Sequence, residues 1–191
     1  MTYYRIKADK DTYGWFELDM DKVLRALGRK TFSNFTKTDA SIIDKWEDFD
    51  ARFDPPDGEV VVSARPDITS WGSTCRLVLN EKAFGVLKRL LSPYGEFLIT
   101  PCEGQRYRIF NCRTTKPADE SKSQKEMMNG LQTGLINLDF DPTDIAGAPV
   151  FKTDYDLFGS LYCDEQFKSL VEENSLTGIT LREDLATSPL L

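Results

Sequence analysis

The side chains that most often carry out enzymatic chemistry are poorly represented in this sequence, which contains no histidine. Without an imidazole the chain cannot build a Ser-His-Asp triad, a Cys-His dyad or a histidine-ligated metal site. Two pairs of carboxylates, Asp139 with Asp141 and Asp154 with Asp156, could perform acid–base or hydrolytic chemistry. Acids two positions apart in turn-rich segments are more often ordinary loop residues, so we expect no catalytic residues and a protein that is not an enzyme.

Motifs for metals and cofactors are also missing from the sequence. The four cysteines form no C-x-x-C pair, and three of them lie in apolar, strand-like segments. Since disulfides are rare in the cytosol, we predict four buried free thiols. The chain has neither a phosphate-binding loop motif nor a calcium-binding loop motif, so we expect no cofactor and no metal. The cysteines are Cys75, Cys102, Cys112 and Cys163.

Acidic and aromatic residues are concentrated between Asp44 and Glu59. This segment contains seven acids and two bases, so it accounts for most of the net charge of −7. Its aromatic residues Trp46, Phe49 and Phe53 follow an i, i+3, i+7 spacing, which predicts one face of a helix. Two interpretations are open: a solvated acidic helix whose aromatic residues cover the core, or an exposed face with aromatic anchors among charges that match a basic partner. The candidate partner-binding residues are Asp44, Trp46, Glu47, Asp48, Phe49, Asp50, Phe53 and Asp54.

The overall charge limits the partners of the chain. Acids outnumber bases by 31 to 24, whereas a nucleic-acid-binding surface needs Lys and Arg to neutralise phosphates, so we expect no nucleic-acid partner. An acidic protein is suited to a basic protein partner, although the same acidity also favours solubility. No apolar stretch reaches the roughly 18 residues of a membrane span, and the beginning of the sequence lacks the apolar core of a signal peptide. We therefore expect a cytoplasmic protein without membrane contact.

Two amphipathic helices are predicted, each with a polar N-cap. Asn80 precedes one apolar stripe, which ends at the Ser-Pro-Tyr-Gly turn of residues 92–95. Asp164 precedes the other helix, which should end near Asn174, with Gly178 inside a following strand. The apolar stripes comprise Ala83, Phe84, Leu87, Leu90 and Leu91 in the first helix, and Phe167, Leu170 and Val171 in the second.

Apolar and alternating segments predict strands. Glu96–Thr100 and Tyr107–Cys112, with Gly104 between them, predict a hairpin. Near the beginning of the chain, Tyr3–Ala8 is expected to be an edge strand that pairs with Tyr13–Leu18. Further expected elements are a short helix capped by Asp19 or Asp21, a buried strand at Val60–Val62, a loop at Asp67–Gly72 with Trp71 over the core edge, and a strand at Leu135–Phe140.

These elements indicate an α+β fold, in which a mostly antiparallel sheet is packed by the two capped amphipathic helices. Residues 1–58 form a less regular aromatic and acidic part, which is a candidate subdomain. Residues 59–185 form the α+β core, with a polar and partly disordered surface loop at 113–130. Residues 186–191 are expected to be a frayed tail.

Several motifs in the core resemble those of a known family. They are, in chain order, RLVLNEKAFGVLKRLLSPYGEFLITP, YRIFN, ADESKS, GAPVFK and LYCDEQFKSLVEENSLTGITL. From about Val60 to Arg182 the sequence is similar to the family-eleven immunity proteins of bacterial polymorphic-toxin systems, formerly a domain of unknown function. The resemblance implies a protein that binds the C-terminal domain of a cognate toxin in the bacterial cytoplasm, blocks it and has no catalysis of its own.

Three functions are compatible with the sequence. The first is an immunity protein that neutralises a basic toxin domain by stoichiometric occlusion and so protects the producing cell. The second is a histidine-free hydrolase that uses a carboxylate pair. The third is a generic protein-binding module.

Overall fold

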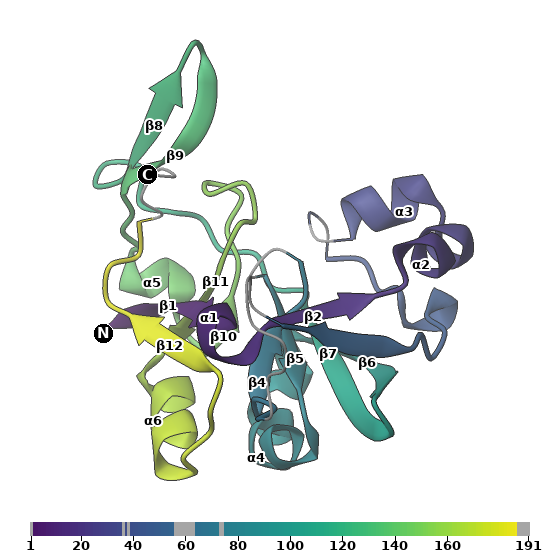
Figure 1. Cartoon of the computed structure of the whole chain (residues 1–191). Helices are drawn as coiled ribbons and strands as arrows, with labels where there is room; N and C mark the ends of the chain where they lie inside the picture. Colours follow the sequence, from purple (N-terminus) through teal and green to yellow (C-terminus); the bar gives the residue numbers. More distant parts are fainter. Residues whose placement is uncertain (1, 36, 38, 56–63, 73–74, 187–191) are drawn as a thin grey trace.

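Two β-sheets and the helices that cover them form the body of the protein, and a separate β-hairpin projects from it (Figure 1). The computed structural model describes residues 2–35, 37, 39–55, 64–72 and 75–186. Within this part of the chain the sheets are mostly antiparallel and several helices are present, which confirms the predicted α+β class. The predicted strand at Val60–Val62 and the tail after residue 186 lie outside the described residues.

Short helices and two single 3₁₀ turns lie between groups of strands along the described chain. They are α1 (Lys10–Tyr13), α2 (Met20–Leu27), α3 (Arg29–Asn34), η1 (Ile43–Lys45), α4 (Glu81–Leu91), η2 (Ser92–Tyr94), α5 (Pro142–Ile145) and α6 (Glu165–Glu173).

The larger sheet contains six of the described strands. Their bounds are β2 (Trp15–Leu18), β3 (Ala51–Asp54), β4 (Ile68–Ser70), β5 (Arg76–Leu79), β6 (Gly95–Cys102) and β7 (Gln105–Cys112). They lie in the order β2-β3-β6-β7-β5-β4, and neighbours are antiparallel except for β3 and β6. The predicted hairpin is confirmed as β6 and β7. Its turn residues Glu103 and Gly104 both have positive φ angles, as a tight two-residue hairpin turn requires.

The predicted loop at Asp67–Gly72 is wrong, because part of this segment forms β4 and pairs with β5. Thr69 and Ser70 are buried although they are polar, and β4 is a short strand at the edge of the sheet. A polar composition in so short a strand is indistinguishable from that of a loop. Trp71 is fully buried and stacks on Phe35 with ring centroids 6.1 Å apart, so it belongs to the core and not to its edge.

The smaller sheet pairs strands from the two ends of the described chain. Its strands are β1 (Tyr3–Ala8), β10 (Val150–Phe151), β11 (Leu161–Asp164) and β12 (Ile179–Arg182). They lie in the order β10-β11-β1-β12, so the prediction that β1 is an edge strand is wrong. β2 also pairs with β3 and not with β1, because α1 and Gly14 carry the chain from one sheet to the other. At Gly14 φ is 76° and a Cβ atom would lie 2.2 Å from the Asp54 carbonyl oxygen, so the crossing requires glycine.

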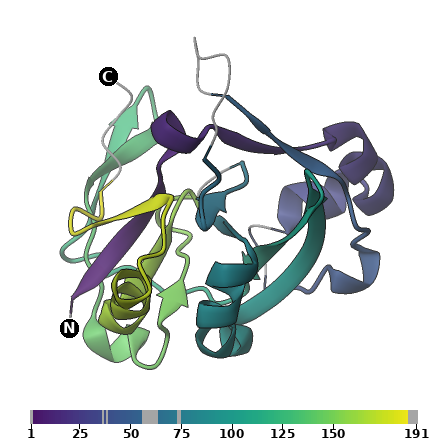
Figure 2. The ribbon, with the colours of Figure 1, turned by 60° about the horizontal axis from the view of Figure 1, so that its bottom comes forward.

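The two predicted capped helices, α4 and α6, are confirmed. The Asn80 side chain accepts a hydrogen bond from the Ala83 N–H at 2.9 Å, and Asp164 accepts one from the Phe167 N–H at 3.0 Å. The helices lie side by side (Figures 1 and 2). Leu87 and Phe167 are fully buried in one cluster with residues from both sheets, so the helices join the two sheets into one core.

Gly178 lies just before β12 and not inside it. Its φ angle is 100°, and a Cβ atom at this position would lie 2.1 Å from the Ile68 carbonyl oxygen. Glycine is therefore needed where the chain passes close to β4.

The part of the chain from β1 to β3 contributes to both sheets. Asp19, one of the two predicted caps, accepts a hydrogen bond from the Lys22 N–H at 3.2 Å and begins α2. Val23 and Leu27 bury one side of α2 in a second core cluster, which also contains residues of β2 and β3. Residues 1–58 thus supply β1 to the smaller sheet and β2 and β3 to the larger one.

The projecting hairpin consists of β8 (Gln124–Met128) and β9 (Leu131–Asn137), and we call it the β8–β9 arm. The predicted polar loop at 113–130 is wrong from residue 124 onward, and the predicted strand at Leu135–Phe140 is confirmed only as far as residue 137. Asn129 and Gly130 both have positive φ angles and form the turn. This Asn-Gly pair is the local hairpin signal that the sequence analysis missed. Leu135 is buried at the base of the arm, whereas the tip extends away from the body (Figure 1).

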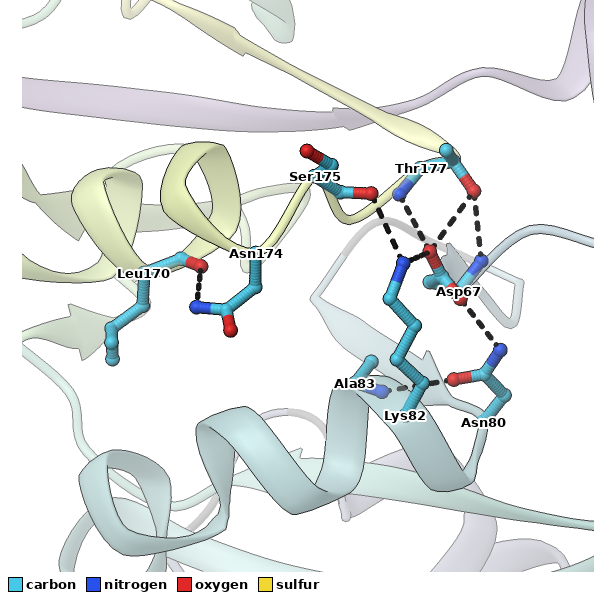
Figure 3. Close-up of polar contacts among 8 residues, drawn as sticks. All are labelled: Asp67, Asn80, Lys82, Ala83, Leu170, Asn174, Ser175 and Thr177. Carbon is cyan, nitrogen blue, oxygen red and sulfur yellow. Dashed lines mark hydrogen bonds and ion pairs between the residues drawn. The ribbon is translucent and has the colours of Figure 1, made fainter.

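A buried carboxylate connects the two sheets near the start of α4 (Figure 3). Asp67 accepts hydrogen bonds from Asn80 Nδ2 and Lys82 Nζ, both at 2.9 Å, and from the Thr177 N–H at 3.0 Å. Lys82 also donates to the Ser175 carbonyl at 3.1 Å. Burial disfavours the ionised carboxylate, but the hydrogen bonds from Lys82, Asn80 and Thr177 outweigh it and hold the pKa of Asp67 below its ordinary value. We call these contacts the Asp67 clamp.

All four cysteines are buried and free, as predicted. In the part of the chain that the structure describes, no helix has the length and apolar character that crossing a membrane requires.

Candidate partner-binding surface

The predicted partner-binding segment is not a helix. After the single turn of η1 the backbone is extended at Trp46. It then makes a tight turn, in which the Phe49 N–H donates to the Glu47 carbonyl at 2.7 Å, and enters β3 at Ala51. Neighbouring side chains of an extended chain face opposite sides, and Phe49 and Phe53 are buried while Asp48 and Asp50 are exposed. The prediction of one helical face is therefore wrong. Phenylalanines four positions apart suit either structure, whereas the alternation of polar and apolar residues from residue 48 onward favours a strand.

Aromatic residues fasten this segment to the core. Trp46 donates a hydrogen bond from Nε1 to the Ile99 carbonyl at 2.8 Å and packs edge-on against Phe49, with ring centroids 4.9 Å apart. Phe53 packs edge-on against Phe16 at 5.3 Å. Phe49 and Phe53 are only 4% and 8% exposed, so they hold the segment in place and offer no surface to a partner. Trp46 is half-buried.

A second contact fastens the beginning of the segment. The buried Glu96 carboxylate on β6 accepts hydrogen bonds from the Ile42 N–H and from Asn111 Nδ2, both at 2.9 Å. The Ser41 hydroxyl also donates to it. Because the segment is tied to β6 both before η1 and at Trp46, its backbone is held in one conformation.

Four exposed carboxylates remain on the outer side of the segment, and we call them the acidic rim. They belong to Asp44, Glu47, Asp48 and Asp50. Within the described part of the chain, none of them forms an ion pair or a side-chain hydrogen bond. Asp54 differs, because its carboxylate lies 2.7 Å from Arg52 Nε and is already paired. The acidic rim therefore presents negative charge that a partner's cations can neutralise.

A small hollow lies beside the acidic rim. Its volume is about 260 Å³, and its lining combines Asp48 with residues of the β6–β7 hairpin. These are Ile99, Pro101, Gly104, Gln105 and Arg106. Ile99 is 39% exposed, so the hollow has an apolar wall next to a carboxylate. Ligand pockets are typically about 300–1,000 Å³, so this hollow suits a single side chain of a partner better than a small molecule.

Three of the four carboxylates in the two candidate hydrolytic pairs accept structural hydrogen bonds. Asp139 accepts a hydrogen bond from the Phe140 N–H at 2.7 Å, and Asp141 begins α5 by accepting one from the Thr143 N–H at 2.8 Å. Asp156 is buried, whereas Asp154 is exposed. Among the residues that the structure describes, no group of three or more Cys, Asp or Glu side chains is placed to hold a metal ion.

Exposed apolar side chains gather on the β8–β9 arm, which sequence reasoning treated largely as a polar loop. Met127, Met128, Leu131 and Ile136 are each more than half exposed, at 55%, 63%, 72% and 58%. Leu157, in the turn between β10 and β11, is 62% exposed. The Asn-Gly turn between the apolar pair Met127–Met128 and Leu131 is the sequence signal for this feature.

No protein-family model matches the sequence, and a comparison with curated proteins found no significant relative.

Proposed function

We propose that this protein is an immunity protein, a stoichiometric inhibitor that binds a basic toxin domain through the acidic rim. The observation that carries the proposal is the set of four exposed carboxylates without cationic partners in the described chain, held on a backbone that the core fixes in place. The resemblance of the core motifs to the family-eleven immunity proteins supports the same function. In this proposal the protein acts in the cytoplasm of the producing bacterium and performs no chemistry of its own.

The mechanism would be electrostatic capture followed by occlusion. Four negative charges on one edge of the molecule speed the encounter with a basic surface and orient it. Because the segment is already fastened by Trp46 and Glu96, little conformational entropy is lost when a partner binds. The hollow beside Asp48 can then receive a partner side chain whose apolar part lies against Ile99, and both Asp48 and Arg106 are present in its lining to bind a polar end.

A toxin fragment encoded beside the gene provides the test. The protein should rescue cells that express this fragment, and the two should co-purify at one to one. The variant E47K/D48K/D50K should slow association at low salt and lose most of the salt dependence, since exposed charges act mainly on the association rate. Its fold should be retained, because surface substitutions usually change stability by about 0.5 kcal/mol or less each.

A matched charge reversal on another face serves as the control. Glu172, Glu173 and Glu183 are exposed and lie on or after α6, away from the segment that carries the rim. E172K/E173K/E183K changes the net charge by the same amount and should leave association nearly unchanged. Equal association rates for the two triple variants would exclude the acidic rim as the toxin-binding site. Failure of the wild-type protein to rescue cells or to co-purify with the fragment would exclude the immunity function.

A further inference from the structure

The turn between β10 and β11 supports the β8–β9 arm. This turn comprises residues 153–160. Gln132 on β9 donates a hydrogen bond from Nε2 to the Tyr155 carbonyl at 2.8 Å. The ammonium of Lys125 on β8 lies 4.4 Å from the centre of the Tyr155 ring, a cation–π contact. Both strands of the arm therefore contact the same residue of the turn, and a movement of the turn would move the arm.

The turn has an unfavourable backbone that one side chain holds together. Leu157 and Phe158 are consecutive non-glycine residues with φ angles of 58° and 60°, a left-handed conformation that costs energy in each. Asp156 accepts a hydrogen bond from the Gly159 N–H at 3.2 Å through one carboxylate oxygen and from the Tyr162 hydroxyl at 2.8 Å through the other. These bonds tie the tip of the turn to β11 and offset the cost of its backbone.

Asp156 is only 8% exposed and has no ion pair within the described residues. Two cationic residues lie near the turn. Arg5 on β1 pairs with Tyr162 on β11 in the register of the smaller sheet, and the Lys152 ammonium lies 5.6 Å from the centre of the Phe158 ring. The other ionisable groups in the turn or in contact with it are Asp154, Tyr155 and Lys125. Burial raises the pKa of Asp156 to about 6, although the hydrogen bonds from Tyr162 and from backbone N–H groups act in the opposite direction.

We propose that Asp156 is a proton switch that sets how firmly the turn at 153–160 holds the β8–β9 arm. When it is protonated, the carboxyl group is neutral and stable inside the turn, so the turn stays closed and the arm stays fixed. When it is ionised, the buried charge favours an open turn in which water solvates the carboxylate. The switch therefore controls how the exposed apolar side chains of the arm are presented, independently of the acidic rim.

The size of the effect follows from the two environments of Asp156. With a pKa of about 6 in the closed turn and about 3.9 in an open, solvated one, the ratio of open to closed turns rises about tenfold between pH 5 and pH 8. Opening must expose the amide groups of the turn and loosen those of the arm, because Tyr155 carries both contacts to the arm.

Hydrogen–deuterium exchange of the full chain tests the proposal. After correction for intrinsic rates, exchange in peptides covering 124–137 and 153–160 should be about tenfold faster at pH 8 than at pH 5, while α4 should show no such change. D156N, which is neutral at both pH values, should abolish the difference. Y162F removes a donor to the carboxylate and should move the transition to higher pH. Equal corrected exchange in the wild-type protein at the two pH values would overturn the proposal.

A measurement on the wild-type protein covers the case in which D156N does not fold. The carboxyl carbon of Asp156 should titrate near pH 6 by nuclear magnetic resonance, together with amide signals of the arm. A titration near the ordinary aspartate value of about 3.9 would also overturn the switch.

Discussion

Removal of the Asp67 carboxylate should weaken the contact between the two sheets. In Asp67→Ala the Thr177 N–H and the Asn80 amide lose their acceptor. A fully buried donor left without a partner costs about 1–3 kcal/mol, but Asn80 and Thr177 are only partly buried or exposed, so each should cost about 1–1.5 kcal/mol. The ion pair with Lys82 adds at most about 1 kcal/mol, since the Lys82 side chain is 51% exposed and water can solvate it again. We therefore expect a total loss of about 2–4 kcal/mol in the free energy of unfolding.

Urea unfolding followed by tryptophan fluorescence measures this loss, and Lys82→Ala is the matched control. Lys82→Ala removes only the exposed partner and leaves the bonds from Asn80 and Thr177, so it should cost about 1 kcal/mol or less. If Asp67→Ala costs no more than Lys82→Ala, the carboxylate does not connect the sheets in the way described.

The same clamp predicts a pH dependence. The pKa of Asp67 is lower in the folded protein than its ordinary value, so the unfolded chain binds a proton more readily. The stability that Asp67 supplies is therefore fully present above about pH 4 and is lost as the pH falls through the lower folded pKa. Unfolding curves between pH 2.5 and 6 should show this loss in the wild-type protein and much less of it in Asp67→Ala.

Two further predictions concern the core. Leu87→Ala and Phe167→Ala should each reduce the free energy of unfolding by about 2–5 kcal/mol, because both side chains are fully buried between the sheets and α4 or α6. Urea midpoints equal to that of the wild-type protein would contradict the described packing. The four cysteines should resist alkylation in the native protein, since all are buried and burial raises the pKa of Cys102 and Cys112 to about 12. After unfolding without reductant all four should react. Mass spectrometry counts the alkyl labels, and two labels fewer than four would indicate a disulfide.

Local signals in the sequence determined the two capped helices and one hairpin. The N-caps Asn80 and Asp164, and the apolar stripes after them, specify α4 and α6 through contacts within a few residues. The turn at Glu103 and Gly104 likewise connects two adjacent apolar strands. In each case the interacting groups are neighbours in the chain, so a short window of sequence contains the whole signal.

Only the tertiary structure decided which strands pair and what the acidic segment does. Tyr3 lies opposite Asp164 in the smaller sheet, and no local pattern records a pairing over such a separation. The exposure of Asp48 and Asp50 was predictable from the alternation of polar and apolar residues, but the bond from Trp46 to Ile99 that holds the segment was not. The burial of Asp156 was likewise not predictable from the sequence, because it depends on the packing of the turn against β11 and not on the neighbouring residues in the chain. Charge and periodicity are properties of the chain, whereas pairing and desolvation arise only when distant segments meet.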